Sequence, residues 1–248
     1  MLANNFTLNS EKSYYMIFFP TNQDNHDLSL DLNVNNKRIN RVQSSKFLGV
    51  TIDDQLKWNF HIQELCLTLR RFVGIFYKLS CKLPPLTLKM LYFAIIYPRI
   101  LYGIEVYANT FQSNLHDLMV LNNRLLRILQ HRKPKTNNSE LYLLYNTLPI
   151  DVLFKFQMLL HAHKIYYNSD NLPKIFIADK LMNSDVHSHN TRSNHDFHRL
   201  HFNTSPGSKV SVSVCTRLWN DLPTHLKQIP CLVHFSKELK ELLQLGNS

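Results

Sequence analysis

The spacing of hydrophobic residues changes near residue 55. Before it, apolar and polar residues alternate over residues 28–34, which predicts a half-buried strand. Residues 47–52 form an apolar, β-branched run around Gly49, which predicts a buried strand with a bulge or a close backbone approach. From Trp58 onward, apolar residues recur at steps of three and four and predict an amphipathic helix over about residues 55–79.

Polar residues mark the turns of the N-terminal region. Residues 14–19 are a further strand candidate, and Asn35-Asn36 suits a hairpin turn because Asn tolerates left-handed dihedral angles. Asp53 and Asp54 end the last strand, and either of them can cap the helix that follows. This region is therefore expected to form a small antiparallel β structure.

Helices dominate the sequence after residue 55. Pro84 and Pro85 end the first helix, and Pro98 is expected to kink or restart the second. Further helices are expected over residues 86–97, 99–108, 114–131, 140–146 and 150–167. From Asn168 onward, the sequence becomes polar and less regular. We therefore expect an α+β fold that is mostly α, with an irregular C-terminal region and with domains over residues 1–54, 55–135 and 136–248.

Basic residues outnumber acidic residues. The chain has 28 Lys and Arg against 18 Asp and Glu, a formal net charge of +10 and a pI of about 9.4. Such an excess favours a polyanionic partner such as nucleic acid, although a basic protein without such a partner is an alternative. The candidate nucleic-acid-binding residues lie along the first and third long helices and just after the third: Arg71, Lys78, Lys82, Arg124, Arg127, Arg132, Lys133 and Lys135. The cations at the end of the third helix could instead simply complement the negative end of the helix dipole. Nucleic-acid binding is favoured for them because the rest of the chain is basic too.

The cysteines and the apolar segments indicate an intracellular protein, nuclear or cytoplasmic. Cys66, Cys81, Cys215 and Cys231 lie far apart without a Cys-x-x-Cys pair, which is typical of buried thiols in a reducing compartment. The N-terminus lacks the basic start and apolar core of a signal peptide. Charges and a proline interrupt residues 86–108, so we expect a buried helix pair there and no membrane partner.

A histidine cluster in the C-terminal region raises the question of a metal site. Its members are His187, His189, His195, His198 and His201. No acidic or cysteine residue lies at a typical ligand spacing, so a polar, basic linker is favoured and no metal site is assigned. Phosphate contact by Thr191, Arg192 and Arg199 is an alternative role for this segment. His161 and His163, two positions apart on a helix, point in different directions and cannot share a metal.

The most specific sequence pattern lies at the change from strand to helix. It consists of Phe47-Leu48-Gly49-Val50 followed by Asp53, Leu56, Trp58 and His61-Ile62. This pattern resembles the junction between palm and thumb in reverse transcriptases of jockey-like non-LTR (LINE) retrotransposons. Residues 91–103, 186–193, 218–223 and 235–243 resemble later segments of the same family in the same order.

The resemblance implies a fold and a role for these residues. In that family, the Phe-Leu-Gly segment is the primer grip, whose backbone holds the growing 3′ end, and the next helix opens the thumb. Phe47, Leu48 and Gly49 would then be primer-grip-like residues. The basic helices would hold RNA, DNA or an RNA–DNA hybrid without reading sequence. The rest of the palm and the fingers of a parent enzyme would be further partners.

The catalytic aspartates of that family are absent from the sequence. One comes from an early palm strand and a pair comes from a Tyr-x-Asp-Asp hairpin, and together they hold two divalent metals. Asp53-Asp54 belongs to the grip junction, and no glycine-rich phosphate loop is found. No catalytic residue and no cofactor is therefore assigned, because magnesium would belong to the missing palm. The family polymerises DNA on an RNA template, but this chain alone is not expected to do so.

Two other functions fit the same sequence. One is a non-enzymatic nucleic-acid-binding or interaction protein derived from a retrotransposon, and the other is a decayed reading frame without function. Of the three possibilities, a C-terminal fragment of the polymerase is the favoured one. Salt-dependent binding of an RNA–DNA hybrid separates it from an interaction protein, because each neutralised phosphate releases counterions.

Overall fold

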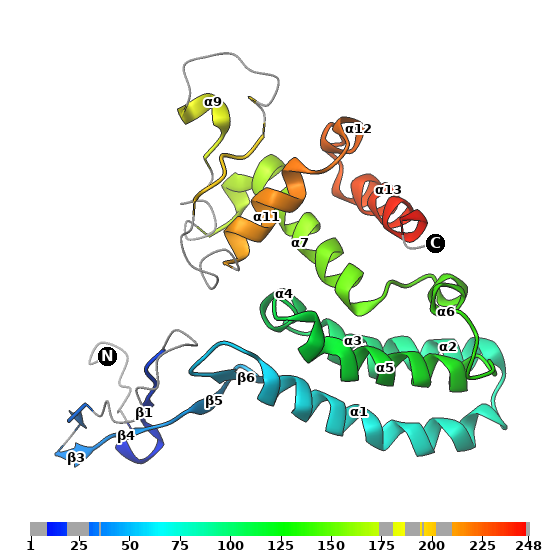
Figure 1. Ribbon diagram of the computed structural model, residues 1–248, viewed down its shortest axis with the longest axis horizontal. Helices are drawn as coiled ribbons and strands as arrows, with labels where there is room; N and C mark the ends of the chain where they lie inside the picture. The colour runs from blue at the N-terminus through cyan, green and yellow to red at the C-terminus, as the bar shows by residue number, and fades with distance from the viewer. Residues whose placement is uncertain are drawn as a thin grey trace. The chain divides into compact units, whose positions relative to one another are not determined.

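The computed structural model describes residues 9–18, 30–34, 36–173, 181–186, 194, 196–201 and 210–246 (Figure 1). Within it, the chain divides into two compact units, residues 1–64 and 65–248. Some expectations fall outside the described residues: the end of the strand over residues 14–19, the start of the strand over residues 28–34, Asn35, Thr191, Arg192, His187, His189 and His195.

Short strands form three pairs in the first unit. The parallel pair is β1 (Tyr14–Tyr15) with β4 (Asn40–Arg41). The antiparallel pairs are β2 (Asn33–Val34) with β3 (Lys37–Arg38), and β5 (Ser44–Phe47) with β6 (Val50–Asp53). One turn of 3-10 helix, η2, spans Ser10–Lys12. The expected hairpin between β2 and β3 is confirmed, and Asn36 adopts the left-handed conformation with φ of 59°.

Residues 47–52 form a hairpin and not the single buried strand that their composition predicts. Leu48 and Gly49 turn the chain between β5 and β6 with φ angles of 47° and 84°. Two successive left-handed residues give the turn whose twist matches paired strands. The side chains of Phe47 and Leu48 are 63% and 75% exposed, so the prediction of burial is wrong for them. The register instead buries the polar residues Thr51 and Asp53.

Helix α1 (Asn59–Ser80) begins four residues later than the periodicity predicts. The carboxylate of Asp53 accepts the backbone N–H groups of Gln55, Lys57 and Trp58 at 3.2, 2.9 and 2.7 Å. All three donors precede the helix. Asp53 therefore fastens a turn in front of the helix, and the prediction that it caps the helix is wrong. The predicted burial of Trp58 is confirmed, because its side chain is 9% exposed.

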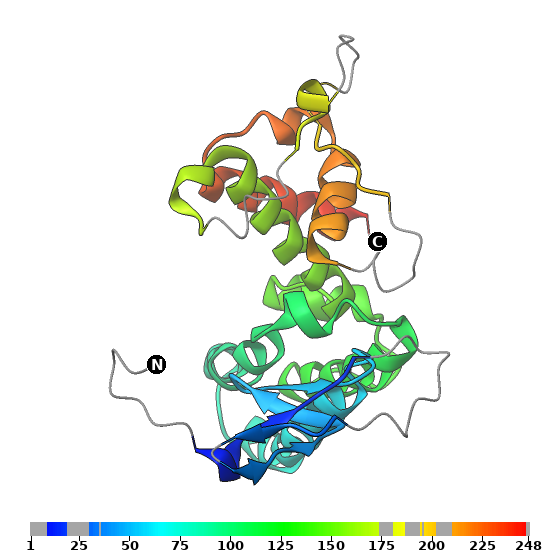
Figure 2. The same cartoon turned by 90° about the vertical axis from the view of Figure 1, so that its left-hand side faces the viewer.

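The second unit is helical, so the chain is mostly α with a few small strands, as expected (Figures 1 and 2). After α1 come α2 (Pro85–Leu91), the π-helical segment η3 (Tyr92–Ile96), α3 (Tyr97–Leu101), α4 (Ile104–Tyr107), α5 (Gln112–Leu129), α6 (Asn138–Tyr145), α7 (Ile150–Tyr167), the 3-10 turn η4 (Ser169–Asn171), α9 (Asn183–Val186), α11 (Ser211–Asn220), α12 (Thr224–Lys227) and α13 (Leu232–Leu245). No helix among the described residues is both long and apolar enough to cross a bilayer.

Pro98 does not interrupt its helix, because α2, η3 and α3 follow one another without a gap. The backbone N–H of Tyr97 bonds the carbonyl of Tyr92 in a π-helical turn. A wider turn gives room to the proline ring, which in a regular α-helix collides with the carbonyl four residues earlier. The break comes instead at Gly103, whose φ is 69°. The predicted restart after the proline is therefore wrong. The predicted burial holds for one face of the segment, notably at Ile96, but not for Leu86 and Met90, which are exposed.

Helix α5 carries a leucine stripe that is buried as predicted, and Asn122 lies within it at 1% exposure. The Tyr92 hydroxyl donates to Asn122 Oδ1, and Asn122 Nδ2 donates to the Tyr142 hydroxyl, both at 3.2 Å. Buried amides are tolerated when their hydrogen bonds are satisfied. The polar interruption of the stripe therefore connects α5 to η3 and to α6.

Helices α11 and α13 both lie beside α7 (Figures 1 and 2). Their contact is aromatic: the ring of His163 on α7 lies 4.4 Å from that of Phe235 and 6.2 Å from that of Trp219, centroid to centroid. Trp219 is fully buried, and Pro223 separates α11 from α12. The region expected to be irregular thus contains two regular helices that complete this core.

Candidate nucleic-acid interface

A basic cavity lies between the end of α1 and the end of α5 in the second unit. Its volume is about 590 Å³. From the end of α1 and the residue just after it, the cavity is lined by Tyr77, Ser80 and Cys81. From α5 and the residues just after it, it is lined by Arg124, Arg127, His131 and Arg132. No carboxylate lies among the described residues that line it. This basic cavity brings together three of the eight cations that the sequence singles out.

The backbone at the end of α5 determines where the side chains of His131 and Arg132 lie. His131 is left-handed, with φ of 52°, and its N–H bonds the carbonyl of Ile128 at 3.3 Å. The next N–H, from Arg132, reaches back to the carbonyl of Arg127 at 2.9 Å. This pair of bonds is the Schellman motif that commonly ends helices, usually with glycine at the left-handed position. The side chains of His131 and Arg132 are thereby held at the negative end of the α5 dipole.

The basic residues of the cavity differ in their side-chain partners. Arg127 donates to Asn138 Oδ1 at 2.6 Å and to the carbonyl of Thr136 at 3.3 Å, and Arg132 forms an ion pair with Glu140 at 3.0 Å. Arg124, by contrast, is exposed, and neither it nor His131 has a side-chain partner in the part of the chain that the structure describes. Arg127 and Arg132 therefore hold the connection between α5 and α6, while Arg124 and His131 remain available to a ligand.

The other predicted cations are exposed but do not line the basic cavity. Lys78 and Lys82 flank Tyr77 and Cys81 along the end of α1, and Lys133 and Lys135 follow the cavity residues in the chain. Arg71 lies seven positions before Lys78, which is about 10 Å along the helix. We refer to Lys78, Lys82, Lys133 and Lys135 as the lysine rim.

Phe47, Leu48 and Gly49, the primer-grip-like residues, belong to the first unit. They form the exposed tip of the β5–β6 hairpin. Nothing in the described contacts tests a role in holding a primer, so this role stays a prediction.

Tyr77 and Ser80 are cavity residues that the sequence prediction missed. With Cys81, the residue just after α1, they occupy positions i, i+3 and i+4, which lie on one face of a helix. That spacing, next to the basic residues Lys78 and Lys82, is the feature of the sequence from which these cavity residues could have been predicted. What the sequence cannot provide is the packing of this face against the end of α5.

Comparison with protein-family models, with curated proteins and with solved structures finds no match. The resemblance to reverse transcriptases therefore stays a prediction that rests on the sequence patterns. Among the described residues, no group of three or more His, Cys, Asp or Glu side chains is placed to hold a metal ion. His161 and His163 do lie in different surroundings, the former in a second cavity and the latter in the aromatic core.

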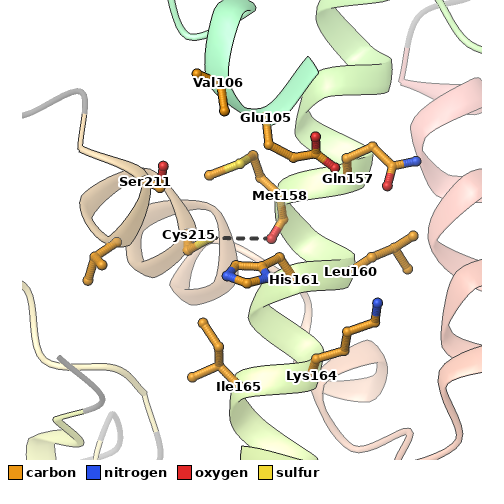
Figure 3. A pocket seen from close by; sticks show the side chains of 11 residues that line it. Glu105, Val106, Gln157, Met158, Leu160, His161, Lys164, Ile165, Ser211 and Cys215 are labelled. Atoms are coloured by element: carbon orange, nitrogen blue, oxygen red, sulfur yellow. Dashed lines mark hydrogen bonds between the residues drawn. The ribbon is translucent and has the colours of Figure 1, made fainter. Parts of the chain in front are cut away.

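The second cavity, of about 360 Å³, is lined by α4, α7 and α11 (Figure 3). Its walls are mostly apolar, with Met158 and Ile165 among the lining residues. The thiol of Cys215 donates to the carbonyl of Met158 at 3.5 Å, and burial raises the pKa of Cys215 to about 12. A thiol held in its neutral form is a poor nucleophile. Burial also lowers the pKa of His161, whose ring lies beside Cys215 in Figure 3.

The cysteines are not all buried, contrary to expectation. Cys66 and Cys215 are buried, but Cys81 and Cys231 are exposed, and all four are free thiols. The N–H groups of His234 and Val233, at the start of α13, lower the pKa of Cys231. Exposed free thiols persist in reducing surroundings, so this correction leaves the expected compartment untouched.

Proposed function

We propose that the chain binds the phosphate backbone of nucleic acid through the basic cavity and the lysine rim. The observation that carries the proposal is the gathering of Arg124, Arg127, His131 and Arg132 around one cavity without a lining carboxylate. The net charge of +10 supports it, because a basic surplus attracts polyanions over the whole surface.

Arg124 and His131 are the side chains expected to contact a phosphate directly. Each has a side chain without a partner among the described residues, so binding costs no existing ion pair. A guanidinium group donates two parallel hydrogen bonds to phosphate oxygens, which makes arginine the stronger of the two ligands. The lysine rim would add attraction that does not depend on sequence.

The resemblance to LINE-type reverse transcriptases gives this binding a place in a larger activity. In that reading, α1 to α5 are the thumb, and the basic cavity and the lysine rim clamp the primer–template duplex. The backbone around Gly49 would hold the primer end. This backbone lies at the exposed tip of the β5–β6 hairpin and is therefore accessible. RNA-directed DNA polymerisation itself would depend on aspartates that this chain lacks.

A protein-binding function is the second candidate. It is favoured by large apolar side chains that α1 and α2 leave exposed: Leu67 and Ile75 at 57% and 50%, and Leu86 and Met90 at 71% and 63%. Where such side chains form a contiguous apolar surface, they mark a site of protein contact. In the retrotransposon reading, the partner would be the rest of the palm and fingers.

Binding of an RNA–DNA hybrid at increasing salt tests the proposal. Fluorescence anisotropy of a labelled hybrid should show affinity that falls steeply with salt, because each neutralised phosphate releases counterions. The double substitution Arg124→Ala/His131→Ala should weaken binding and reduce the salt slope by about one for each lost phosphate contact. Arg217→Ala, which removes an exposed cation from α11, is the matched control. Weak binding that ignores salt would favour the protein-binding function.

Primer extension tests the absence of polymerase activity in the chain alone. With an RNA template, a DNA primer, deoxynucleotides and magnesium, we expect no incorporation, because no aspartate pair is available to hold two metals. Clear incorporation by the purified chain would overturn this expectation.

A further inference from the structure

Tyr77 places an aromatic ring at the wall of the basic cavity. Its side chain is 67% exposed, so the ring is not part of the protein core. Tyrosine rings at exposed positions beside arginines are typical of surfaces that bind single-stranded nucleic acid, where bases stack on the rings and cations hold the backbone. The cavity therefore contains both kinds of group that a nucleotide requires.

The wall of the cavity also contains two basic side chains, Arg124 and His131, that have no side-chain partner among the described residues. A guanidinium group donates paired hydrogen bonds to the oxygens of a phosphate. These two side chains therefore point to an anionic oxygen ligand such as a phosphate.

The size of the cavity limits what can enter it. Its volume of about 590 Å³ lies within the range of about 300–1,000 Å³ that is usual for small-molecule sites. The bases of an intact duplex are stacked on one another and offer no face to a protein ring. A nucleotide that enters such a cavity and stacks on Tyr77 must be unpaired.

We infer that the basic cavity takes one unpaired nucleotide, with its base on the ring of Tyr77 and its phosphate on Arg124 and His131. The inference rests on the proposed function, and it adds that a strand leaving a duplex binds here while the paired part lies on the lysine rim. The recognising chemistry, a flat base joined to a phosphate, is common to DNA and RNA.

The test compares a blunt duplex with the same duplex carrying a short single-stranded tail, in one series a thymidine tail of DNA and in another a uridine tail of RNA. The unmodified protein should bind tailed duplexes about tenfold more tightly than the blunt one, in line with the stacking of one base on an aromatic side chain. The two tails show whether DNA or RNA is preferred. Tyr77→Leu should abolish the preference for the tail. Tyr102→Leu, at another exposed tyrosine outside the cavity, should keep the preference.

A tryptophan variant gives a second readout of stacking. Tyr77→Trp should keep the preference for the tail, and its additional fluorescence should be quenched by tailed duplexes but not by blunt ones. Equal affinity of the unmodified protein for tailed and blunt duplexes overturns the inference, as does a preference that survives in Tyr77→Leu. If the blunt duplex binds with a steep salt dependence but the tail adds nothing, only this inference fails. If neither duplex binds, the proposed function fails with it.

Discussion

The carboxylate of Asp53 accepts the backbone N–H of Trp58 at 2.7 Å, and the same carboxylate holds two further N–H groups of the turn before α1. Asp53 is 4% exposed, so its carboxylate has little contact with water. One acidic side chain thus organises the whole path from the last strand to the longest helix.

Replacing Asp53 should therefore loosen this turn. Asp53→Ala leaves three N–H groups without their acceptor, and we expect a loss of about 2–3 kcal/mol in the local free energy of unfolding. Hydrogen exchange of the amides of Gln55, Lys57 and Trp58 measures that loss directly. Asp54→Ala, at the neighbouring position, is the control and should leave the exchange of these amides slow. Unchanged exchange in Asp53→Ala would contradict the assigned role.

Asn122 should be more stabilising than a leucine at the same position, although it interrupts a leucine stripe. Asn122→Leu removes the acceptor of the buried Tyr92 hydroxyl, which costs about 1–3 kcal/mol of stability. The double substitution Asn122→Leu/Tyr92→Phe removes both partners and should recover part of that loss. Denaturant unfolding followed by circular dichroism measures both variants. Equal stability of the single and the double variant would show that the Tyr92–Asn122 bond contributes little.

The parts of the fold that local periodicity determines could be predicted from the sequence. Helix α7 spans Ile150–Tyr167, as expected, because apolar residues recur along its length and a proline precedes it. The β5–β6 hairpin could not be predicted in this way, because Leu48 is a residue that rarely takes a left-handed conformation. Because the chain turns at Leu48, the pattern of apolar residues wrongly predicts that Phe47 and Leu48 are buried.

Prediction of the candidate site is limited by tertiary packing. The sequence identifies Arg124 and Arg127 as cations at a helix end, but it does not reveal that only the latter is tied down by Asn138. Nor does it reveal that Tyr77 lies opposite them, since that depends on how α1 packs against α5. The basic residues at a helix end can be predicted from the sequence, whereas the cavity that they line depends on how the helices pack.

The two arginines should respond differently to substitution. Arg127→Ala removes hydrogen bonds to Asn138 and Thr136 and should cost about 1–2 kcal/mol of stability. Arg124→Ala removes no protein partner among the described residues, so it should leave the melting temperature unchanged while weakening nucleic-acid binding. Thermal unfolding and anisotropy on the same samples give both values. A stability loss in Arg124→Ala equal to that in Arg127→Ala would contradict this division of roles.

The four thiols should fall into two classes of reactivity. Cys81 and Cys231 are exposed and should react rapidly with a thiol reagent in the folded protein, whereas the buried Cys66 and Cys215 should react only after unfolding. Cys231 should react first at neutral pH, because backbone N–H groups lower its pKa. A spectroscopic thiol assay measures how fast the cysteines react. The same assay on Cys231→Ser shows which part of the fast reaction belongs to Cys231. Rapid reaction of Cys215 in the folded protein would contradict the packing of α11 on α7.

Acid should weaken the aromatic core formed by α7, α11 and α13. Burial lowers the pKa of His163, the hydrogen bond from Nε2 to the carbonyl of Ile229 opposes that shift, and Nδ1 is buried without a partner among the described residues. The folded protein therefore resists protonation of this ring more than the unfolded chain does. Its contribution to stability is fully present above the unfolded pKa of about 6.5 and falls as the pH drops below that value.

The melting temperature should thus decrease between about pH 7 and pH 5, with a smaller decrease in His163→Gln. His161 and His61, whose pKa values burial also lowers, supply the part that remains in this variant. His116→Gln, at an exposed position of α5, is the control and should keep the full decrease. The rings of Phe235 and Trp219 cannot accept the proton that a charged His163 would carry on Nδ1, so the core must open to solvate it. A melting temperature that falls equally with acid in His163→Gln and in the unmodified protein would place the acid-sensitive group elsewhere.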